Sequence, residues 1–119
     1  MSLALPKSMR LGGAMAVQHL HREGKHFVAW PLRVTYLPMD EEMDGQSVTQ
    51  IVVWAPKRLF KHAVDRNRLK RLMREAWRLN QAKLQGTYQI AFDYIDPHIQ
   101  TFQTIEKAVC KAIKKIVEK

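Results

Sequence analysis

The sequence predicts an α+β sandwich, in which a small sheet packs against helices in the order α-β-β-α-β-α. Three short segments show the apolar alternation or continuous apolar run of strands, and three longer segments place apolar residues at helical spacing. The chain has 119 residues, 46% of them apolar, which suits one hydrophobic core. We therefore expect a single domain over residues 1–119, with residues 1–10 flexible.

The first half of the chain predicts one helix and two strands. The helix covers residues 13–22 and ends at Gly24 as its C-cap, because glycine tolerates the backbone conformations of helix ends. Residues 32–37 alternate as a strand, and the nearly continuous apolar run 48–55 predicts a central strand. The acidic stretch 38–46 between them predicts an exposed hairpin loop. The inward residues of the helix are expected to be Ala14, Val17, Leu20 and His21.

The second half predicts a helix, a strand and a closing helix. The helix begins at Asp65, a residue type that caps helix N-termini, and its apolar stripe is Leu69, Leu72, Met73, Ala76 and Trp77. Residues 88–94 alternate as the third strand. The closing helix is expected to bury Phe102, Ile105, Val109, Ala112, Ile113 and Ile116. Trp54, Trp77 and Cys110 are predicted to be buried.

Positive charge is concentrated in one part of the chain. The whole chain carries 20 Lys+Arg against 11 Asp+Glu, a net charge of +9, and residues 57–78 alone hold nine basic and two acidic residues. On the helix of this segment the cations form a row opposite the apolar stripe, with no acidic residue in it and with neighbours about 5–6 Å apart. Like charges at this spacing destabilise a helix, so we expect an anionic partner such as a nucleic-acid backbone. The row consists of Asn67, Lys70, Arg71, Arg74 and Arg78, with Arg66 and Arg68 at its flanks.

Several classes of function are disfavoured. A single cysteine excludes an internal disulfide and a thiolate metal site. The five histidines show no metal-ligand spacing, and no carboxylate cluster accompanies the basic segment, so we predict neither a metal site nor a catalytic residue on the protein. No signal peptide or membrane span is evident, and we expect a cytoplasmic protein without a membrane partner.

The basic segment also carries an extended motif. It reads FKHAVDRNRLKRLMREAWR from Phe60 to Arg78, with Arg66-Asn67-Arg68 at its centre, and Ala55-Pro56-Lys57-Arg58 precedes it. This motif resembles the signature of the bacterial ribonuclease P protein component, the small basic subunit of the RNA enzyme that removes the 5′ leader from precursor tRNA. The order of the predicted elements matches that family over nearly the whole chain.

The resemblance implies a fold and a division of labour. The fold is the ribosomal-protein S5 domain 2-like sandwich, in which the basic helix joins two parallel strands by a left-handed crossover. Mg²⁺ ions held mainly by the catalytic RNA subunit activate the water that cleaves the phosphodiester, so the protein supplies no catalytic side chain. The implied partners are that RNA and the 5′ leader of precursor tRNA, with no obligate protein partner.

The resemblance further implies two sets of RNA-contacting residues. The first set is Lys57, Arg58, Lys61, Arg66, Asn67, Arg68, Lys70, Arg71, Arg74 and Arg78. For Asn67 and Arg68, an alternative role is to hold the loop before the helix through backbone carbonyls. The second set lines a cleft for the leader between the first helix and the sheet, and it consists of Val17, His21 and Tyr36. A purely structural role is the alternative for Val17 and Tyr36, and Trp30 is a further candidate for leader contact.

Two other functions share the basic charge. A non-enzymatic ribosomal-type RNA-binding protein has the same charge and fold type, but it does not need the extended motif. A DNA-binding regulator would insert the basic helix into a major groove, yet Asn67 is the one residue of the row suited to reading base edges.

Overall fold

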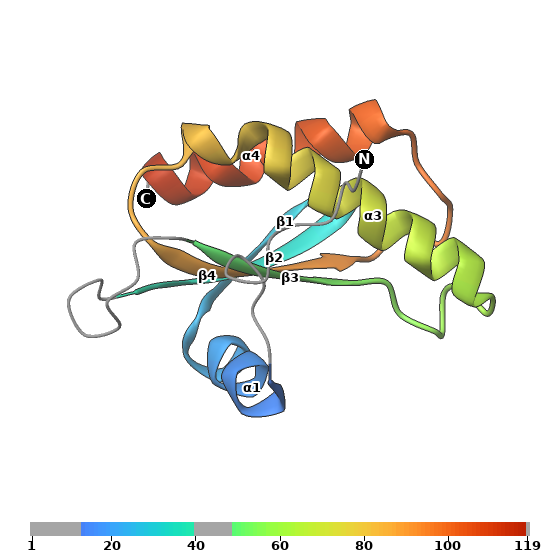
Figure 1. Ribbon diagram of the computed structural model, residues 1–119, viewed down its shortest axis with the longest axis horizontal. Coiled ribbons are helices and arrows are strands. Elements are labelled where there is room, and N and C mark those ends of the chain that lie inside the picture. Colours follow the sequence, from blue (N-terminus) through green and yellow to red (C-terminus); the bar gives the residue numbers. More distant parts are fainter. Residues whose placement is uncertain (1–12, 40–48, 119) are drawn as a thin grey trace.

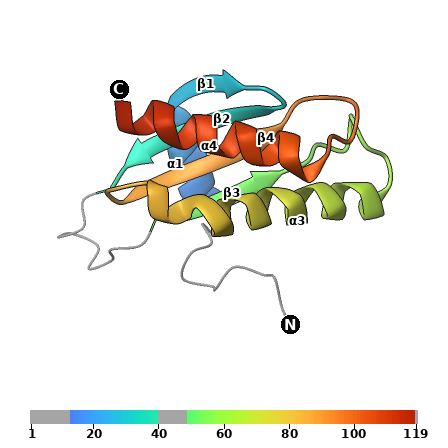
Figure 2. The same cartoon turned by 90° about the horizontal axis from the view of Figure 1, so that it is seen from above.

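One four-stranded sheet separates two layers of helix in the computed structural model, which describes residues 13–39 and 49–118 (Figure 1). The elements in chain order are α1 (Ala14–Glu23), β1 (Lys25–Ala29), β2 (Leu32–Pro38), β3 (Gln50–Trp54), α3 (Ala63–Asn80), the 3-10 helix η2 (Gln81–Lys83), β4 (Tyr88–Tyr94) and α4 (Phe102–Glu118). The helices α3 and α4 lie side by side on one face of the sheet, whereas α1 lies on the other (Figure 1 and Figure 2). The predicted α+β fold class is confirmed.

The strands follow the order β1-β2-β4-β3 across the sheet. The strand β2 pairs antiparallel with both β1 and β4, and β3 pairs in parallel with β4. Parallel neighbours need a long crossover, and α3 provides it between β3 and β4. The left-handed sense of this crossover stays a prediction.

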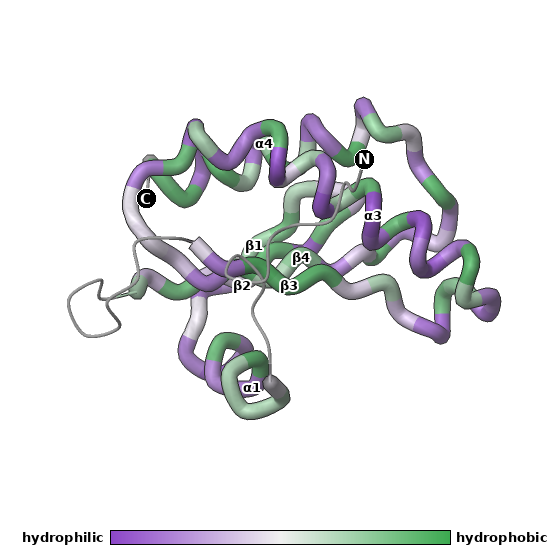
Figure 3. Tube along the Cα trace, in the orientation of Figure 1, coloured by the Kyte–Doolittle hydropathy of each residue, from purple (hydrophilic) through white to green (hydrophobic). Residues whose placement is uncertain are grey.

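The main core lies between the sheet and the α3–α4 layer. Side chains alternate between the faces of a strand, so every second residue of β2, β3 and β4 faces this layer. Hydrophobic and hydrophilic residues alternate around α3 and α4 (Figure 3), as expected for helices with one buried side. The buried residues at this interface include Leu32, Val34, Tyr36, Ile51, Val53, Leu69, Met73, Ala76, Trp77, Ile90, Phe92, Tyr94, Ile105, Val109, Ala112, Ile113 and Ile116.

The sheet differs from the prediction in three ways. The sequence analysis missed β1, an edge strand in which only Ala29 is buried, so it lacks an apolar alternation. The predicted central strand, β3, is the opposite edge strand, and the sheet's centre is β2 and β4. A hairpin between β2 and β3 is wrong as well, because β4 lies between them; most of its predicted loop, residues 40–46, falls outside the described residues. The flexibility predicted for residues 1–10 also falls outside them.

Several residue predictions in the helices also need correction. The N-cap of α3 is His62, and Asp65 lies in the first turn, where its charge still favours the helix dipole. In α1, Ala14 and His21 are exposed, since this short helix covers only part of the sheet. Cys110 is half-buried rather than part of the core.

Two other expectations hold. Gly24 is the C-cap of α1, where its N–H donates to the Leu20 carbonyl at 2.8 Å. A Cβ at this glycine would lie 2.8 Å from the Tyr36 carbonyl oxygen, so a larger residue would force the helix away from β2. Of the two tryptophans predicted to be core residues, Trp77 is 1% exposed as expected, whereas Trp54 is 59% exposed.

Candidate RNA-binding surfaces

The outer side of α3 presents a row of cations to solvent. The helix buries Leu69, Met73 and Trp77 against the sheet, and the 3.6-residue period then turns the basic positions outward. Asn67, Arg68 and Arg71 are exposed, and Lys70, Arg74 and Arg78 are half-buried. The predicted helical phase of the basic segment is therefore confirmed.

One arginine of the motif holds the protein's own backbone. The Nη1 group of Arg66 donates to the carbonyl oxygens of Phe60 and Lys61, both at 2.8 Å. These bonds fix the segment that leads into α3. The sequence analysis considered this role for Asn67 and Arg68, but the structure places it on Arg66.

A second arginine is partly neutralised. The Nε group of Arg78 donates to a Glu75 carboxylate oxygen at 3.1 Å, and an ion pair joins the same two side chains. The hydrogen bond from Arg78 lowers the pKa of Glu75, and the same bond raises the pKa of Arg78. At its C-terminal end, the row of cations therefore has an acidic neighbour, Glu75.

Six other cations of the basic segment are available to a ligand. Within residues 13–39 and 49–118, no hydrogen bond or ion pair involves the side chains of Lys57, Arg58, Lys61, Arg68, Lys70 and Arg71. Arginine binds phosphate oxygens bidentately, so an RNA backbone is a suitable partner for this surface. We call the row of Arg68, Lys70, Arg71 and Arg74 the α3 surface.

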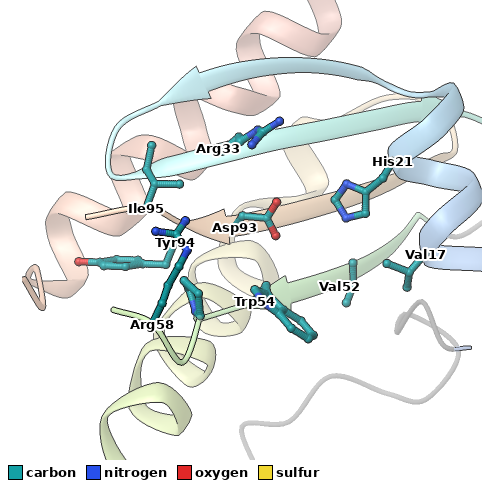
Figure 4. Close-up of a pocket in the computed structure, with 10 residues that line it drawn as sticks. Val17, His21, Arg33, Val52, Trp54, Arg58, Asp93, Tyr94 and Ile95 are labelled. Atoms are coloured by element: carbon teal, nitrogen blue, oxygen red, sulfur yellow. The ribbon is translucent and has the colours of Figure 1, made fainter. Parts of the chain in front are cut away.

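A groove lies on the opposite face of the sheet, beside α1 (Figure 4). It has a volume of about 340 Å³ and combines apolar, aromatic and charged side chains. It is lined by Val17, His21, Arg33, Val52, Trp54, Pro56, Arg58, Asp93, Tyr94 and Ile95. We call it the α1 groove.

The α1 groove contains two of the three predicted cleft residues. Val17 and His21 of α1 lie at one end (Figure 4). Tyr36 does not reach it, because its side chain points to the other face of the sheet, where its ring meets those of Phe27 and Tyr88. The structure therefore corrects the assignment of Tyr36 to the cleft. Trp30, the further candidate, is exposed but is not among the residues that line the groove.

Sequence reasoning missed three residues of the groove floor: Arg33, Asp93 and Trp54. Strand pairing sets Arg33 of β2 opposite Asp93 of β4, and Asp93 in turn opposite Trp54 of β3. The alternation within a strand predicts the face of the sheet on which each residue lies. The alignment of these three residues depends on how separate strands pair, and local sequence patterns do not reveal that pairing.

Two histidines border this floor. His26 bonds through Nδ1 with the Thr35 hydroxyl at 2.9 Å and through Nε2 with the His21 carbonyl at 3.1 Å. Because a carbonyl can only accept, Nε2 must carry the proton, and the Nδ1 of a neutral ring then accepts from Thr35. The His21 ring stacks on that of His26, with 6.5 Å between centroids, so these bonds also support the wall of the groove.

Asp93 is the carboxylate among the residues that line the groove. Burial raises its pKa, and the nearby charges of His21, Arg33 and His26 oppose that rise. A protein Mg²⁺ site is typically built from oxygen ligands, whereas Asp93 is surrounded by potential cations. In the part of the chain that the structure describes, no group of three or more His, Cys, Asp or Glu side chains could hold a metal. No described helix is long and apolar enough to cross a membrane.

The fold and these two surfaces define a class of protein. A basic α+β domain with a cationic helix on one face and an aromatic, arginine-lined groove on the other has the features of a protein that binds single-stranded or folded RNA. A family model described as Ribonuclease P matches residues 5–117. The chain belongs to the ribonuclease P protein component family.

The similarity to individual relatives supports this family assignment. The chain is 37% identical over 122 residues to the ribonuclease P protein component of Porphyromonas gingivalis, covering 97% of this chain and 88% of that protein. It is 36% identical over 91 residues to the protein of the same description from Chlorobaculum tepidum, covering 76% and 58%.

Solved structures show the same fold at lower sequence identity. The RNase P protein of Staphylococcus aureus superposes with a TM-score of 0.75 at 19% identity, covering 93% of this chain and 96% of that one. The RNase P protein from Thermotoga maritima gives a TM-score of 0.75 at 19% identity, covering 89% and 96%.

Proposed function

We propose that the chain binds the catalytic RNA of ribonuclease P through the α3 surface and the single-stranded 5′ leader of precursor tRNA in the α1 groove. Family membership supports a role in tRNA processing together with the RNase P RNA. The observation that carries the proposal is that α3 and α1, which bear the two surfaces, lie on opposite faces of one sheet (Figure 1). One rigid domain can therefore hold two RNA segments at once.

The α3 surface suits a folded RNA backbone. Its cations are spaced by helical turns, at about the separation of successive phosphates. Arg68 and Arg71 are exposed and have no side-chain partner among the described residues, so binding RNA would not break an existing ion pair. Lys57 and Lys61, which precede the helix, extend the same charge toward the start of α3.

The α1 groove suits a short single strand. Trp54 offers an exposed ring on which a base can stack, and stacking on an aromatic side chain tolerates any base. Arg33 and Arg58 provide positive charge beside that ring for the flanking phosphates. Val17 and Val52 give the groove an apolar wall against which a base can pack.

The hydrolytic chemistry is proposed to reside in the RNA partner, in the cytoplasm. Mg²⁺ held mainly by that RNA would activate water and stabilise the leaving oxygen. The protein's part is then to position the leader and to neutralise phosphate charge where the two RNAs meet. No obligate protein partner is required for this arrangement.

Reconstitution with the RNase P RNA tests the proposal. At low Mg²⁺ concentration, adding the protein should increase the cleavage rate of precursor tRNA that carries a leader of several nucleotides. The increase should be much smaller for a precursor with a one-nucleotide leader, which cannot reach along the groove. Equal stimulation of both precursors would contradict leader binding, and no stimulation of either would contradict the role as a subunit.

A further inference from the structure

A cation, a carboxylate and an aromatic ring form one row across the floor of the α1 groove. Strand register aligns Arg33, Asp93 and Trp54 on β2, β4 and β3. Figure 4 shows Asp93 between the other two side chains, with its carboxylate on the side of His21. Neighbouring strands are about 4.8 Å apart, so a base stacked on Trp54 brings its edge to Asp93.

The carboxylate of Asp93 would weaken binding in a groove that recognised only phosphates. Its negative charge repels a nucleic-acid backbone, and burial makes that charge costly to the protein. Its charged and titratable neighbours are His21 from α1, His26 from β1, Arg33 from β2 and Arg58 after β3. Yet within the described ranges no hydrogen bond or ion pair reaches it. Its oxygens are therefore open to hydrogen bonds from a ligand that enters the groove.

The bases differ in the donors that they can offer to a carboxylate. On its Watson–Crick edge, guanine presents two adjacent donors, N1–H and the 2-amino group, which match the two oxygens of one carboxylate. Adenine and cytosine each place one amino donor beside a ring acceptor, which repels the second oxygen. Uracil offers one N–H between two carbonyl oxygens. Guanine is therefore the base that Asp93 fits.

We infer that Asp93 makes the α1 groove a guanine-reading subsite, in which the base stacks on Trp54 and donates its N1–H and 2-amino hydrogens to the Asp93 carboxylate. Arg33 and Arg58 hold the flanking phosphates. This inference rests on the proposed function of the groove, and it adds a base preference to sequence-tolerant stacking. Leaders with a guanine within reach of the groove are then bound in preference to leaders of uridine alone.

Binding of short RNAs tests this subsite on the intact protein. The probes are fluorescently labelled pentauridylate and the same pentamer with guanosine, adenosine or cytidine at its central position, measured by anisotropy at pH 7. The wild-type protein should bind the guanosine pentamer about 5- to 150-fold more tightly than pentauridylate, the range expected for one bidentate base contact. The adenosine and cytidine pentamers should show a much smaller gain.

Asp93→Asn is the informative variant. It keeps the size of the side chain but replaces one acceptor by a donor, so the preference for guanosine should disappear. Because the repulsive charge is also gone, affinity for pentauridylate should rise or stay equal. Glu23→Gln removes one negative charge from the end of α1, outside the groove, and should retain the guanosine preference.

The outcomes separate the inference from the proposed function. If wild-type protein binds all four pentamers equally and Trp54→Ala weakens them all, the groove binds leaders but Asp93 does not read them, and the inference fails. If Asp93→Asn changes affinity for every pentamer by the same factor, the carboxylate acts through charge alone, which also overturns it. If the pentamers bind with an affinity that Trp54→Ala leaves unchanged, the groove is not the leader site and the proposed function fails at this surface.

Discussion

The helices cover the two faces of the sheet to different extents. On one face, α3 and α4 bury nearly every side chain that the strands direct toward them. On the other face, the ten-residue helix α1 buries Leu20 and Ala91 but leaves Trp54 and Arg33 open to solvent. The residues of a fully covered face stabilise the fold and cannot reach a ligand, whereas an incompletely covered face leaves aromatic and charged residues available to a ligand.

The largest effect is expected from the tryptophan on the covered face. Trp77 is 1% exposed and packs against Phe92, with 6.1 Å between ring centroids. Its Nε1 has no hydrogen-bond partner in the described structure, so its stabilising contribution comes from packing. Trp77→Ala should lower the free energy of unfolding by about 3–5 kcal/mol. Urea denaturation followed by circular dichroism measures this, and a loss below about 1 kcal/mol would contradict the assignment of Trp77 to the core.

The matched substitution on the open face should separate binding from stability. Trp54 is 59% exposed, so Trp54→Ala should change the free energy of unfolding by less than about 1 kcal/mol. The same variant should weaken binding of a leader oligonucleotide by about 1–3 kcal/mol through loss of stacking. Equilibrium binding and urea denaturation of the two tryptophan variants, measured in parallel, test the contrast. A large loss of stability without a loss of binding would show that the α1 groove is structural.

The α3 surface should respond to salt rather than to leader sequence. Arg71→Ala removes one exposed cation, so the slope of log K against log salt for the RNase P RNA should fall by about 0.7–0.9. Arg78→Ala should lower the slope less, because Glu75 already neutralises part of that charge. Lys107→Ala, an exposed cation on α4, is a control that should leave the slope unchanged. If the control and Arg71→Ala behave alike, the α3 surface has no special role.

The same contrast explains how much the sequence could predict. On the covered face, burial imposes a regular period, and the apolar stripe of α3 follows it from Leu69 to Trp77. The limits of β4 were also predicted correctly, since residues 88–94 alternate throughout. The misplacement of Tyr36 came from the family resemblance, although the alternation that groups it with Leu32 and Val34 already places it on the core face.

The open face was harder to predict because its signals are not local. The apolar run that suggested a central position for β3 includes Val52 and Trp54, which lie on the incompletely covered face: Val52 packs against the small Leu20–Ala91 cluster and lines the groove, and Trp54 is exposed. Likewise, β1 has two polar residues followed by three apolar ones, so its sequence does not alternate, and as an edge strand it needs little burial. The row of Arg33, Asp93 and Trp54 depends on register between strands far apart in the chain, which no periodicity encodes.

The smallest expected effect concerns the stability cost of Asp93. Burial raises the pKa of Asp93 in the folded protein above that of an unfolded aspartate. The folded state therefore binds this proton more tightly, so the cost of ionising Asp93 grows as the pH rises from the ordinary pKa of aspartate to the raised pKa and is complete above it. Asp93→Asn should raise the Tm modestly at pH 7, and the gain should shrink as the pH falls toward the ordinary pKa range of aspartate, where both states are protonated.

Asp96→Asn provides the control of opposite sign for this last comparison. Hydrogen bonding from Gln100, and further from His98, lowers the pKa of Asp96. Its ionised form therefore favours folding, and Asp96→Asn should lower the Tm at pH 7, with a deficit that fades in acid. Thermal unfolding of both variants from pH 7 to pH 3 measures the two trends. If Asp93→Asn is instead less stable than the wild type at pH 7, the Asp93 carboxylate stabilises the open face of the sheet. The presence of this carboxylate could then no longer be attributed to ligand recognition at the expense of stability.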